Sequence, residues 1–324
     1  MATFSEWAAA ATGVDVAGLG LAVHDDGDRS GPVVTFLHGY PSSSLDVVPV
    51  LERLAGVRVV ALDFPGFGAS DKPPGHEHSI HGAADAVEAV WHELGVSSSA
   101  LLAHDYGVSV AQELLARQAD AGGGPAAGVA VTGVVWTNGG LYSDLHRATV
   151  GQQLLLDPEH GAEVAAAMDE AAFARGIRGT WGARRLMSDD EVHQMWCGLA
   201  HGGGARQAHR LLHYVADRRR YGDRWIPALE TCPLPMRFVW GELDPVSGGH
   251  VADRLAVRLP HVPLQRLDDV GHWPPLEAPD EVAAAVRQLV APGSATAGAW
   301  SVRHVVELPA DADGHEAGGD RPET

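Results

Sequence analysis

The chain has 324 residues, of which 45% are hydrophobic, and its formal net charge is −19 at pH 7. A chain of this size and composition can bury a large core, and one α/β domain with an inserted subdomain fits as well as two domains. Its acidic balance argues against nucleic acid or an anionic membrane as a partner, and no apolar run is long enough to span a bilayer. Cys197 and Cys232 are too few for a disulfide framework and do not have the spacing of a metal site. Residues 1–11 lack the basic segment of a secretion signal, so we expect a cytoplasmic protein.

Strand and helix patterns alternate through most of the chain. Predicted strands cover residues 33–37, 57–62, 100–103, 131–136, 236–240 and 263–267, a predicted hairpin covers 14–24, and predicted helices cover 45–54, 79–94, 108–119, 250–258 and 280–290. Such alternation indicates a mostly parallel central sheet with helices on both faces. Between residues 140 and about 226 the patterns are only helical, over 162–174, 189–199 and 205–221. This stretch predicts a helical cap inserted in the sheet domain.

The predicted organisation is therefore a core in two parts with the cap between them. The first part of the core covers residues 1–139, the cap 140–229 and the second part of the core 230–291. Residues 292–324 are polar and rich in Gly, Ala and Asp, and we predict that they form a flexible tail. Ligands of parallel sheets bind at the carboxyl ends of the strands. Four polar side chains follow such ends, namely His38, Asp63, Asp105 and Asn138.

Residues 101–107, Leu-Leu-Ala-His-Asp-Tyr-Gly, have the pattern of a nucleophile elbow. A strand runs into a sharp turn and then a helix, with small residues two positions before and two positions after the central side chain. That central residue is Asp105, and a carboxylate is suited to attack an sp3 carbon and form an alkyl ester that water then hydrolyses. The alternative interpretation is an Asp that ends a strand and caps the following helix.

Two further residues follow later strands and complete a hydrolytic triad. Asp244 and His272 come after Asp105 in the order nucleophile, acid, histidine. We predict that His272 takes a proton from the attacking water and that Asp244 orients the imidazole. The backbone N–H groups of Tyr40, in the loop after His38, and of Tyr106 are predicted to form an oxyanion hole. Taken singly, Asp244 also fits a turn and His272 a loop, but their order and their places after strands argue against coincidence.

These motifs resemble the α/β-hydrolase superfamily, and within it the branch of epoxide hydrolases and haloalkane dehalogenases that use an Asp nucleophile. The matching stretches are residues 38–41 (His-Gly-Tyr-Pro), 63–73, 104–107 (His-Asp-Tyr-Gly) and 271–274 (Gly-His-Trp-Pro). Residues 101–107, 111–115, 137–140 and 243–246 are similar to the mesoderm-specific transcript protein family. The resemblance covers about residues 30–290 and implies an α/β-hydrolase fold with an inserted cap.

The resemblance leaves the leaving group open. Epoxide hydrolases of this branch usually use two cap tyrosines as proton donors. Tyr214 lies where the second would fall, although it also fits a half-buried helix residue, and for the first only Tyr142 is nearby. Haloalkane dehalogenases typically have Trp after the nucleophile and Asn or Trp in the oxyanion loop, where this chain has Tyr106 and Tyr40 without a side-chain N–H. Asn138 follows a strand after which some dehalogenases place a carboxylate, so we predict that it replaces or assists the acid.

We therefore predict a hydrolase that opens an epoxide to a diol, with haloalkane dehalogenation as the alternative. A catalytically silent ligand-binding protein of the same fold is the alternative from another class. The expected partners are a small apolar electrophilic substrate and water, with no cofactor and no metal, and the oligomeric state stays open. The run Arg218-Arg219-Arg220 is predicted to be a charged helix end.

Overall fold

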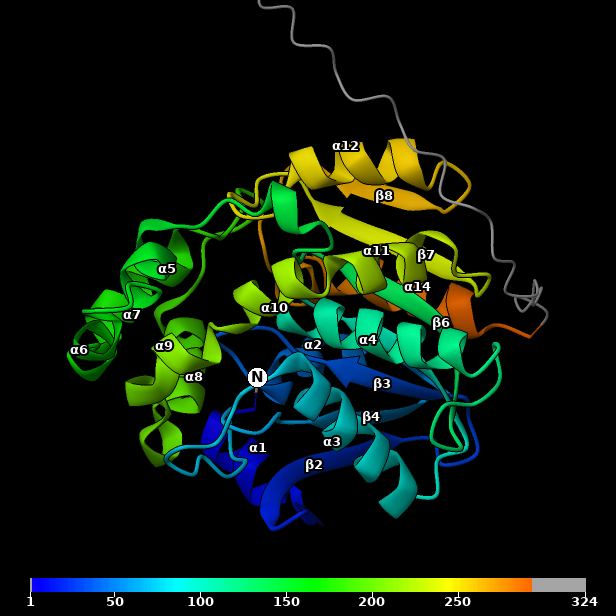
Figure 1. Ribbon diagram of the computed structural model, residues 1–324, viewed down its shortest axis with the longest axis horizontal. Coiled ribbons are helices and arrows are strands. Elements are labelled where there is room, and N and C mark those ends of the chain that lie inside the picture. Colours follow the sequence, from blue (N-terminus) through cyan, green and yellow to red (C-terminus); the bar gives the residue numbers. More distant parts are fainter. Residues whose placement is uncertain (1, 293–324) are drawn as a thin grey trace, which may run out of the picture.

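The computed structural model describes residues 2–292, and within them an eight-stranded sheet forms the centre of the molecule (Figure 1). The strand order is β1-β2-β4-β3-β5-β6-β7-β8. β2 pairs antiparallel with β1 and β4, and the other neighbouring strands run parallel. The strands are β1 (Thr12–Val16), β2 (Leu19–Gly27), β3 (Val33–Leu37), β4 (Arg58–Leu62), β5 (Ser98–Ala103), β6 (Ala130–Thr137), β7 (Met236–Gly241) and β8 (Leu264–Leu267). The predicted edge hairpin and mostly parallel sheet are confirmed.

Helices cover both faces of the sheet, which explains why inner strands such as β3 and β4 are mostly apolar on both faces. In β4, Val60 and Leu62 belong to one core and Val59 and Ala61 to the other. The first face is covered by α3 (Ile80–Glu93), α4 (Tyr106–Asp120) and α12 (Gly249–Arg258), with α11 (Gly222–Glu230) packed against α4. The second face is covered by η1 (Ser44–Val47), α2 (Val48–Leu51), α13 (Pro274–Glu277) and α14 (Pro279–Val290).

The helices between β6 and β7 include a group that lies beyond one end of the sheet, on the left in Figure 1. Besides α11, the helical elements between β6 and β7 are η2 (Ser143–Leu145), α5 (Val150–Leu155), α6 (Gly161–Ala166), α7 (Glu170–Arg178), α8 (Asp189–Ala200), η3 (His201–Gln207), α9 (Ala208–Leu211) and α10 (Tyr214–Arg220). The single helix predicted over 162–174 is wrong, because the Asp169 side chain accepts a hydrogen bond from the N–H of Ala172 and starts a new helix there. The helix predicted over 205–221 is likewise divided into η3, α9 and α10. The cap boundaries of 140 and 229 stay a prediction.

The N-terminal helix α1 (Phe4–Ala10) was not anticipated from the sequence. It begins with a capping box in which Thr3 and Glu6 satisfy each other's backbone N–H groups. The N–H of Phe4 donates to Gln194 of α8 at 2.7 Å, so this helix ties the cap to the core. No helix within residues 2–292 is both long and apolar enough to cross a membrane. The predicted tail lies outside the described residues, apart from residue 292.

Candidate active site

A tight turn between β5 and α4 presents the side chain of Asp105. Its backbone has φ 42° and ψ −101°, a strained conformation for a residue with a side chain. Two residues on, a Cβ at Gly107 would lie 2.1 Å from the carbonyl oxygen of Leu37. The helix therefore passes the end of β3 too closely for any side chain, and the predicted strand, turn and helix with a small residue at 107 are confirmed.

Four groups from the described residues surround the Asp105 carboxylate. The N–H of Tyr40 donates to Oδ2 at 3.0 Å, and the Tyr214 hydroxyl lies 3.1 Å from Oδ2 and 3.3 Å from Oδ1. The Arg218 guanidinium is 3.6 Å from Oδ1, and Nε2 of His272 is 4.0 Å from the same oxygen. Burial favours the neutral acid, but the charges of His272 and then Arg218 outweigh it and lower the pKa of Asp105. The carboxylate is therefore ionised at neutral pH.

His272 is oriented by Asp244. Nδ1 of the imidazole lies 2.7 Å from Oδ2 of Asp244, which leaves Nε2 on the side of Asp105. Burial disfavours the imidazolium, but the Asp244 carboxylate outweighs it and raises the pKa of His272 to about 9. Asp244 also accepts hydrogen bonds from the N–H of Val246 at 2.7 Å and the hydroxyl of Ser247 at 2.6 Å. These contacts hold the acid in one orientation.

Asn138 joins the same network. Its amide nitrogen donates to Oδ2 of Asp244 at 3.0 Å and to the carbonyl of Gly241 at 2.8 Å. The N–H of Gly241 donates back to Oδ1 of Asn138 at 2.7 Å. Asn138 therefore fastens the ends of β6 and β7 together and donates a hydrogen bond to Asp244. That it replaces or assists the acid stays a prediction.

The His38 side chain does not contact Asp105 within the described structure. Its Nδ1 lies 2.9 Å from the carbonyl oxygen of Gly39, and its Nε2 accepts the N–H of Phe64 at 3.1 Å. Both ring nitrogens are thus used to hold the loop that carries Tyr40. A direct contact of His38 with substrate stays a prediction.

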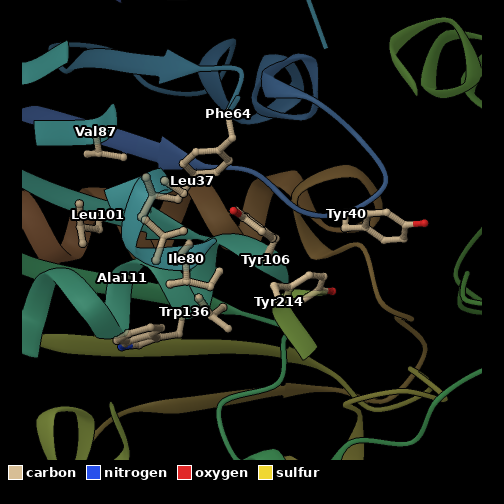
Figure 2. Packing of buried hydrophobic residues seen from close by; sticks show 14 of the residues in the cluster. Leu37, Tyr40, Phe64, Ile80, Val87, Leu101, Tyr106, Ala111, Trp136 and Tyr214 are labelled. Atoms are coloured by element: carbon tan, nitrogen blue, oxygen red, sulfur yellow. The ribbon is translucent and has the colours of Figure 1, made fainter. Parts of the chain in front are cut away.

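The three tyrosines near Asp105 differ in direction. Figure 2 shows the hydroxyls of Tyr40 and Tyr214 on one side and that of Tyr106 pointing the opposite way. The Tyr106 ring packs against Phe64 and Phe67, and no hydrogen bond joins the N–H of Tyr106 to the carboxylate in the described part of the chain. The role predicted for Tyr106 in an oxyanion hole stays a prediction.

Two side chains depart from what the sequence suggested. The Tyr142 hydroxyl donates to Glu230 at 3.1 Å, so it is not directed at Asp105. The run Arg218-Arg219-Arg220 is a charged helix end, as predicted, because α10 ends at Arg220. The sequence did not indicate that Arg218 is buried: only 3% of its side chain is exposed, and its guanidinium contacts Asp105. A signal was available in the spacing, since Tyr214 and Arg218 are four residues apart and share one helix face.

A segment between α7 and α8 docks on the loop that carries His272. The carbonyl of Thr180 accepts the N–H of His272 at 2.8 Å. The buried Glu277 carboxylate accepts the N–H of Gly182 from this segment at 2.8 Å and the N–H of Gly271 from the histidine loop at 3.1 Å. The position of His272 therefore depends on contacts with the cap.

A cavity of about 660 Å³ opens over Asp105 and His272. Most of its lining residues lie between positions 149 and 180, with apolar side chains that include Leu155, Val164, Met168, Phe173 and Ile177. Among its described lining residues, Arg175 is the one charged side chain besides Asp105 and His272, and no hydrogen bond or ion pair joins it to another described residue. The cavity has the size and apolar character of a small-molecule site.

Comparison with known proteins identifies the family of this chain. The model of the "Alpha/beta hydrolase family" matches residues 36–285. The chain belongs to that family. Among its relatives, the mesoderm-specific transcript homolog protein of Bos taurus is 36% identical over 254 residues, which are 76% of this chain and 75% of the relative. A Mycobacterium tuberculosis protein named LipZ is 36% identical over 268 residues, which are 81% of this chain and 91% of the relative.

Solved structures of the same fold include haloalkane dehalogenases. The haloalkane dehalogenase DbeA from Bradyrhizobium elkani has a TM-score of 0.73 at 23% identity, covering 86% of this chain and 97% of that one. The Cfl2 protein from Burkholderia cenocepacia has a TM-score of 0.71 at 20% identity, covering 86% and 95%. At these identities the likeness shows the fold alone. The α/β-hydrolase fold predicted from the sequence is confirmed.

Proposed function

We propose that this chain is a cytoplasmic, cofactor-free hydrolase that opens an epoxide to a diol through an ester on Asp105. The observation that carries this proposal is the Tyr214 hydroxyl, 3.1 Å from Oδ2 of Asp105. In the in-line attack the epoxide oxygen leaves on the far side of the attacked carbon, so the substrate must enter between the carboxylate and the Tyr214 hydroxyl, and the hydroxyl then turns from Asp105 to the ring oxygen. The site thus offers a nucleophile and a proton donor side by side.

In the first step a carboxylate oxygen of Asp105 attacks one epoxide carbon, and the C–O bond of that carbon breaks. The ring oxygen takes the proton of the Tyr214 hydroxyl, which leaves a hydroxyalkyl ester on Asp105 and a phenolate on Tyr214. Burial and the negative charge of Asp105 raise the pKa of Tyr214, so its hydroxyl holds its proton until this step. Consumption of the carboxylate charge then makes transfer of the proton easier.

Before the second step the imidazolium of His272 gives its proton to the Tyr214 phenolate, which restores the hydroxyl and leaves His272 neutral. Neutral His272 then takes a proton from water through Nε2, and the water oxygen attacks Cγ of the ester. The oxyanion that forms is stabilised by the N–H of Tyr40, which already donates to Oδ2. The intermediate expels the alkoxide, which takes the proton from His272 and leaves as the diol. The protonated Asp105 returns its proton to His272, and the site is restored with one water consumed.

The side chains around Asp105 favour an epoxide over a halide. A departing halide needs N–H donors rather than a proton. The side chains at positions 40 and 106 are phenols. The Arg218 guanidinium is turned toward Ser109 and the backbone of Asp105, and it is not among the residues that line the cavity. Haloalkane dehalogenation is the second candidate, favoured by a Bradyrhizobium diazoefficiens haloalkane dehalogenase that is 34% identical over 32% of this chain.

The test is to trap the ester in a His272→Gln variant of the whole chain. The variant is incubated with matched epoxides and haloalkanes of increasing apolar length, and its intact mass is recorded. Without the base the Asp105 ester should form and persist. His272→Gln with Asp105→Asn is the control for the site of attachment, and His261→Gln, an exposed histidine, is the control for loss of an imidazole.

The mass of the adduct identifies the reaction. A gain equal to the whole epoxide, mapped to Asp105 and absent from the double variant, supports the proposal. A gain equal to the alkyl group without its halogen makes the protein a dehalogenase. An adduct on another residue overturns the mechanism. If no compound forms an adduct or is turned over by the unaltered protein, but epoxides bind, the ligand-binding alternative replaces it.

A further inference from the structure

A buried arginine of the cap contacts the elbow. Arg218 lies on α10, and its side chain is 3% exposed, whereas the next two residues of the same run, Arg219 and Arg220, are exposed. Taking a charged group out of water costs free energy unless it is paired and hydrogen-bonded. The partners that satisfy Arg218 belong to Asp105 and to α4, so the cap and the elbow are joined through a charged contact.

The guanidinium holds the backbone of the strained turn. Its Nη2 donates to the carbonyl oxygen of Asp105 at 2.7 Å, and its Nε donates to the hydroxyl of Ser109, one turn further along α4, at 2.8 Å. A Cβ at Gly140 would lie 2.3 Å from Nη1, so a side chain at this position would displace the guanidinium from its place. Three segments therefore fix the guanidinium in one place.

The same group carries a positive charge close to the carboxylate. Nη2 of Arg218 is 3.6 Å from Oδ1 of Asp105. The titratable or charged groups that act on Asp105 come from several elements. They are His272 in the loop after β8, Tyr214 and Arg218 on α10, His104 directly after β5, His38 and Tyr40 in the loop after β3, and His146 after β6. Burial, with smaller effects from nearby cations, lowers the pKa of His104 to about 3 and that of His146 to about 4. Burial also lowers the pKa of His38. At neutral pH these three histidines are uncharged, which leaves His272 and Arg218 as the charged cations of this set.

Arg218 also lies against the proton donor. Its guanidinium carbon is 4.5 Å from the centre of the Tyr214 ring, a distance at which a cation is attracted to an aromatic face. Both residues are on one face of α10, and both contact Asp105. The negative charge that leaves Asp105 during ring opening passes to the oxygen of Tyr214, so the cation is near this charge before and after the step.

We propose that Arg218 is a positioning residue that, from the cap helix α10, fixes the Asp105 elbow through its backbone carbonyl and places a permanent positive charge beside Asp105 and Tyr214. This inference rests on the proposed function, because it assigns Arg218 a part in ester formation at Asp105. Its geometric and electrostatic parts are separable, since a lysine at 218 keeps the charge but cannot donate in the fixed fork of a guanidinium.

The experiment compares substitutions of Arg218 in the His272→Gln background. The rate of adduct formation is measured against pH by intact mass, with a reactive epoxide that forms the ester, and thermal unfolding is recorded for each variant. Arg219→Met is the matched control, because it removes an exposed arginine from the next position of the same helix. Ser109→Ala removes an anchor of the guanidinium without changing any charge.

Arg218→Met is expected to slow adduct formation about ten- to a hundred-fold and to move the acid limb of its pH profile to higher pH, because the pKa of Asp105 rises without the cation. Arg218→Lys should restore the acid limb but not the rate, and Ser109→Ala should lower the rate without moving the limb. Arg219→Met should change neither. A purely structural role would lower the unfolding temperature and leave the acid limb in place.

The inference is overturned if Arg218→Met folds and shows the rate and acid limb of Arg219→Met. If Arg218→Met does not fold, an unchanged rate in both Arg218→Lys and Ser109→Ala overturns it. A separate measurement does not depend on turnover, namely the pKa of Asp105 from the carbon-13 resonance that Asp105→Asn removes. If no adduct forms in any variant, the proposed function fails, but a raised pKa of Asp105 in Arg218→Met would still support the electrostatic part, and an unchanged pKa would refute it.

Discussion

Tyr214→Phe separates the two leaving groups that the site could serve. The change removes one oxygen atom from a fully buried ring and leaves its contacts with Tyr106 and Arg218 in place. In the proposed reaction it removes the proton donor to the epoxide oxygen. It also removes the hydrogen bonds at 3.1 and 3.3 Å that stabilise the Asp105 carboxylate before attack.

The two effects have opposite consequences for the rate. A positioned general acid contributes about 10²–10⁴-fold, so ring opening should slow by that factor. A hydrogen bond to a charged group contributes about 1.5–3 kcal/mol, and its loss makes the carboxylate more reactive toward a substrate that needs no proton. An alkyl bromide of the same carbon skeleton should therefore react with Asp105 at least as fast in the variant as in the parent.

The assay is single-turnover adduct formation in the His272→Gln background, with an epoxide and the matched bromide compared under the same conditions. Tyr142→Phe is the matched control, because that buried tyrosine donates its hydroxyl to Glu230 rather than to Asp105. If Tyr214→Phe opens the epoxide as fast as Tyr142→Phe does, Tyr214 is not the proton donor. If both substrates slow equally, the hydroxyl only shapes the site.

Two further predictions concern the charges of His272 and Arg175. Since the pKa of His272 is raised to about 9 in the folded chain, its pairing with Asp244 stabilises the fold in full below about pH 6.5 and is lost as the pH rises through about 9. The free energy of unfolding in urea should fall over that range by at most about 3 kcal/mol, and Asp244→Asn should abolish this part of the fall. Arg175→Gln should raise KM by up to about fivefold for an apolar epoxide that carries a remote carboxylate, but it should leave KM for the methyl ester of that epoxide unchanged. Arg178 is already paired with Asp189, so the control variant Arg178→Gln should leave KM unchanged for both compounds.

The elbow was predictable because its requirements are local. The turn needs glycine at position 107 whatever the rest of the fold does, because a Cβ there would lie 2.1 Å from the carbonyl oxygen of Leu37. The convergence of Asp105, Asn138 and Asp244 was predictable from topology, because neighbouring parallel strands bring their carboxyl ends to one edge of the sheet. Neither inference required knowledge of how the cap packs.

The helical character of the stretch between β6 and β7 was predictable but its detail was not, because its side chains take their direction from contacts with the core. The Arg218–Arg220 run was predicted to be a charged helix end, and only the docking of α10 shows that one of its members is turned inward. Helix breaks in the cap also depend on a few dihedral angles, such as the positive φ of Gly202 and Gly203 within η3. The docking of Thr180 on the His272 loop joins residues far apart in the sequence, and no local pattern indicates it.

The charges of the proposed site set the order of its two steps. Before reaction, two carboxylates, Asp105 and Asp244, face two cations, His272 and Arg218. Formation of the ester removes the charge of Asp105, which is one of the charges that raise the pKa of His272, so that pKa falls and the neutral base needed for the second step becomes more populated. Arg218 cannot lose its proton, so its positive charge stays beside Cγ when water attacks and the oxyanion forms. The base is therefore held protonated while the carboxylate is free and is released when there is an ester to hydrolyse.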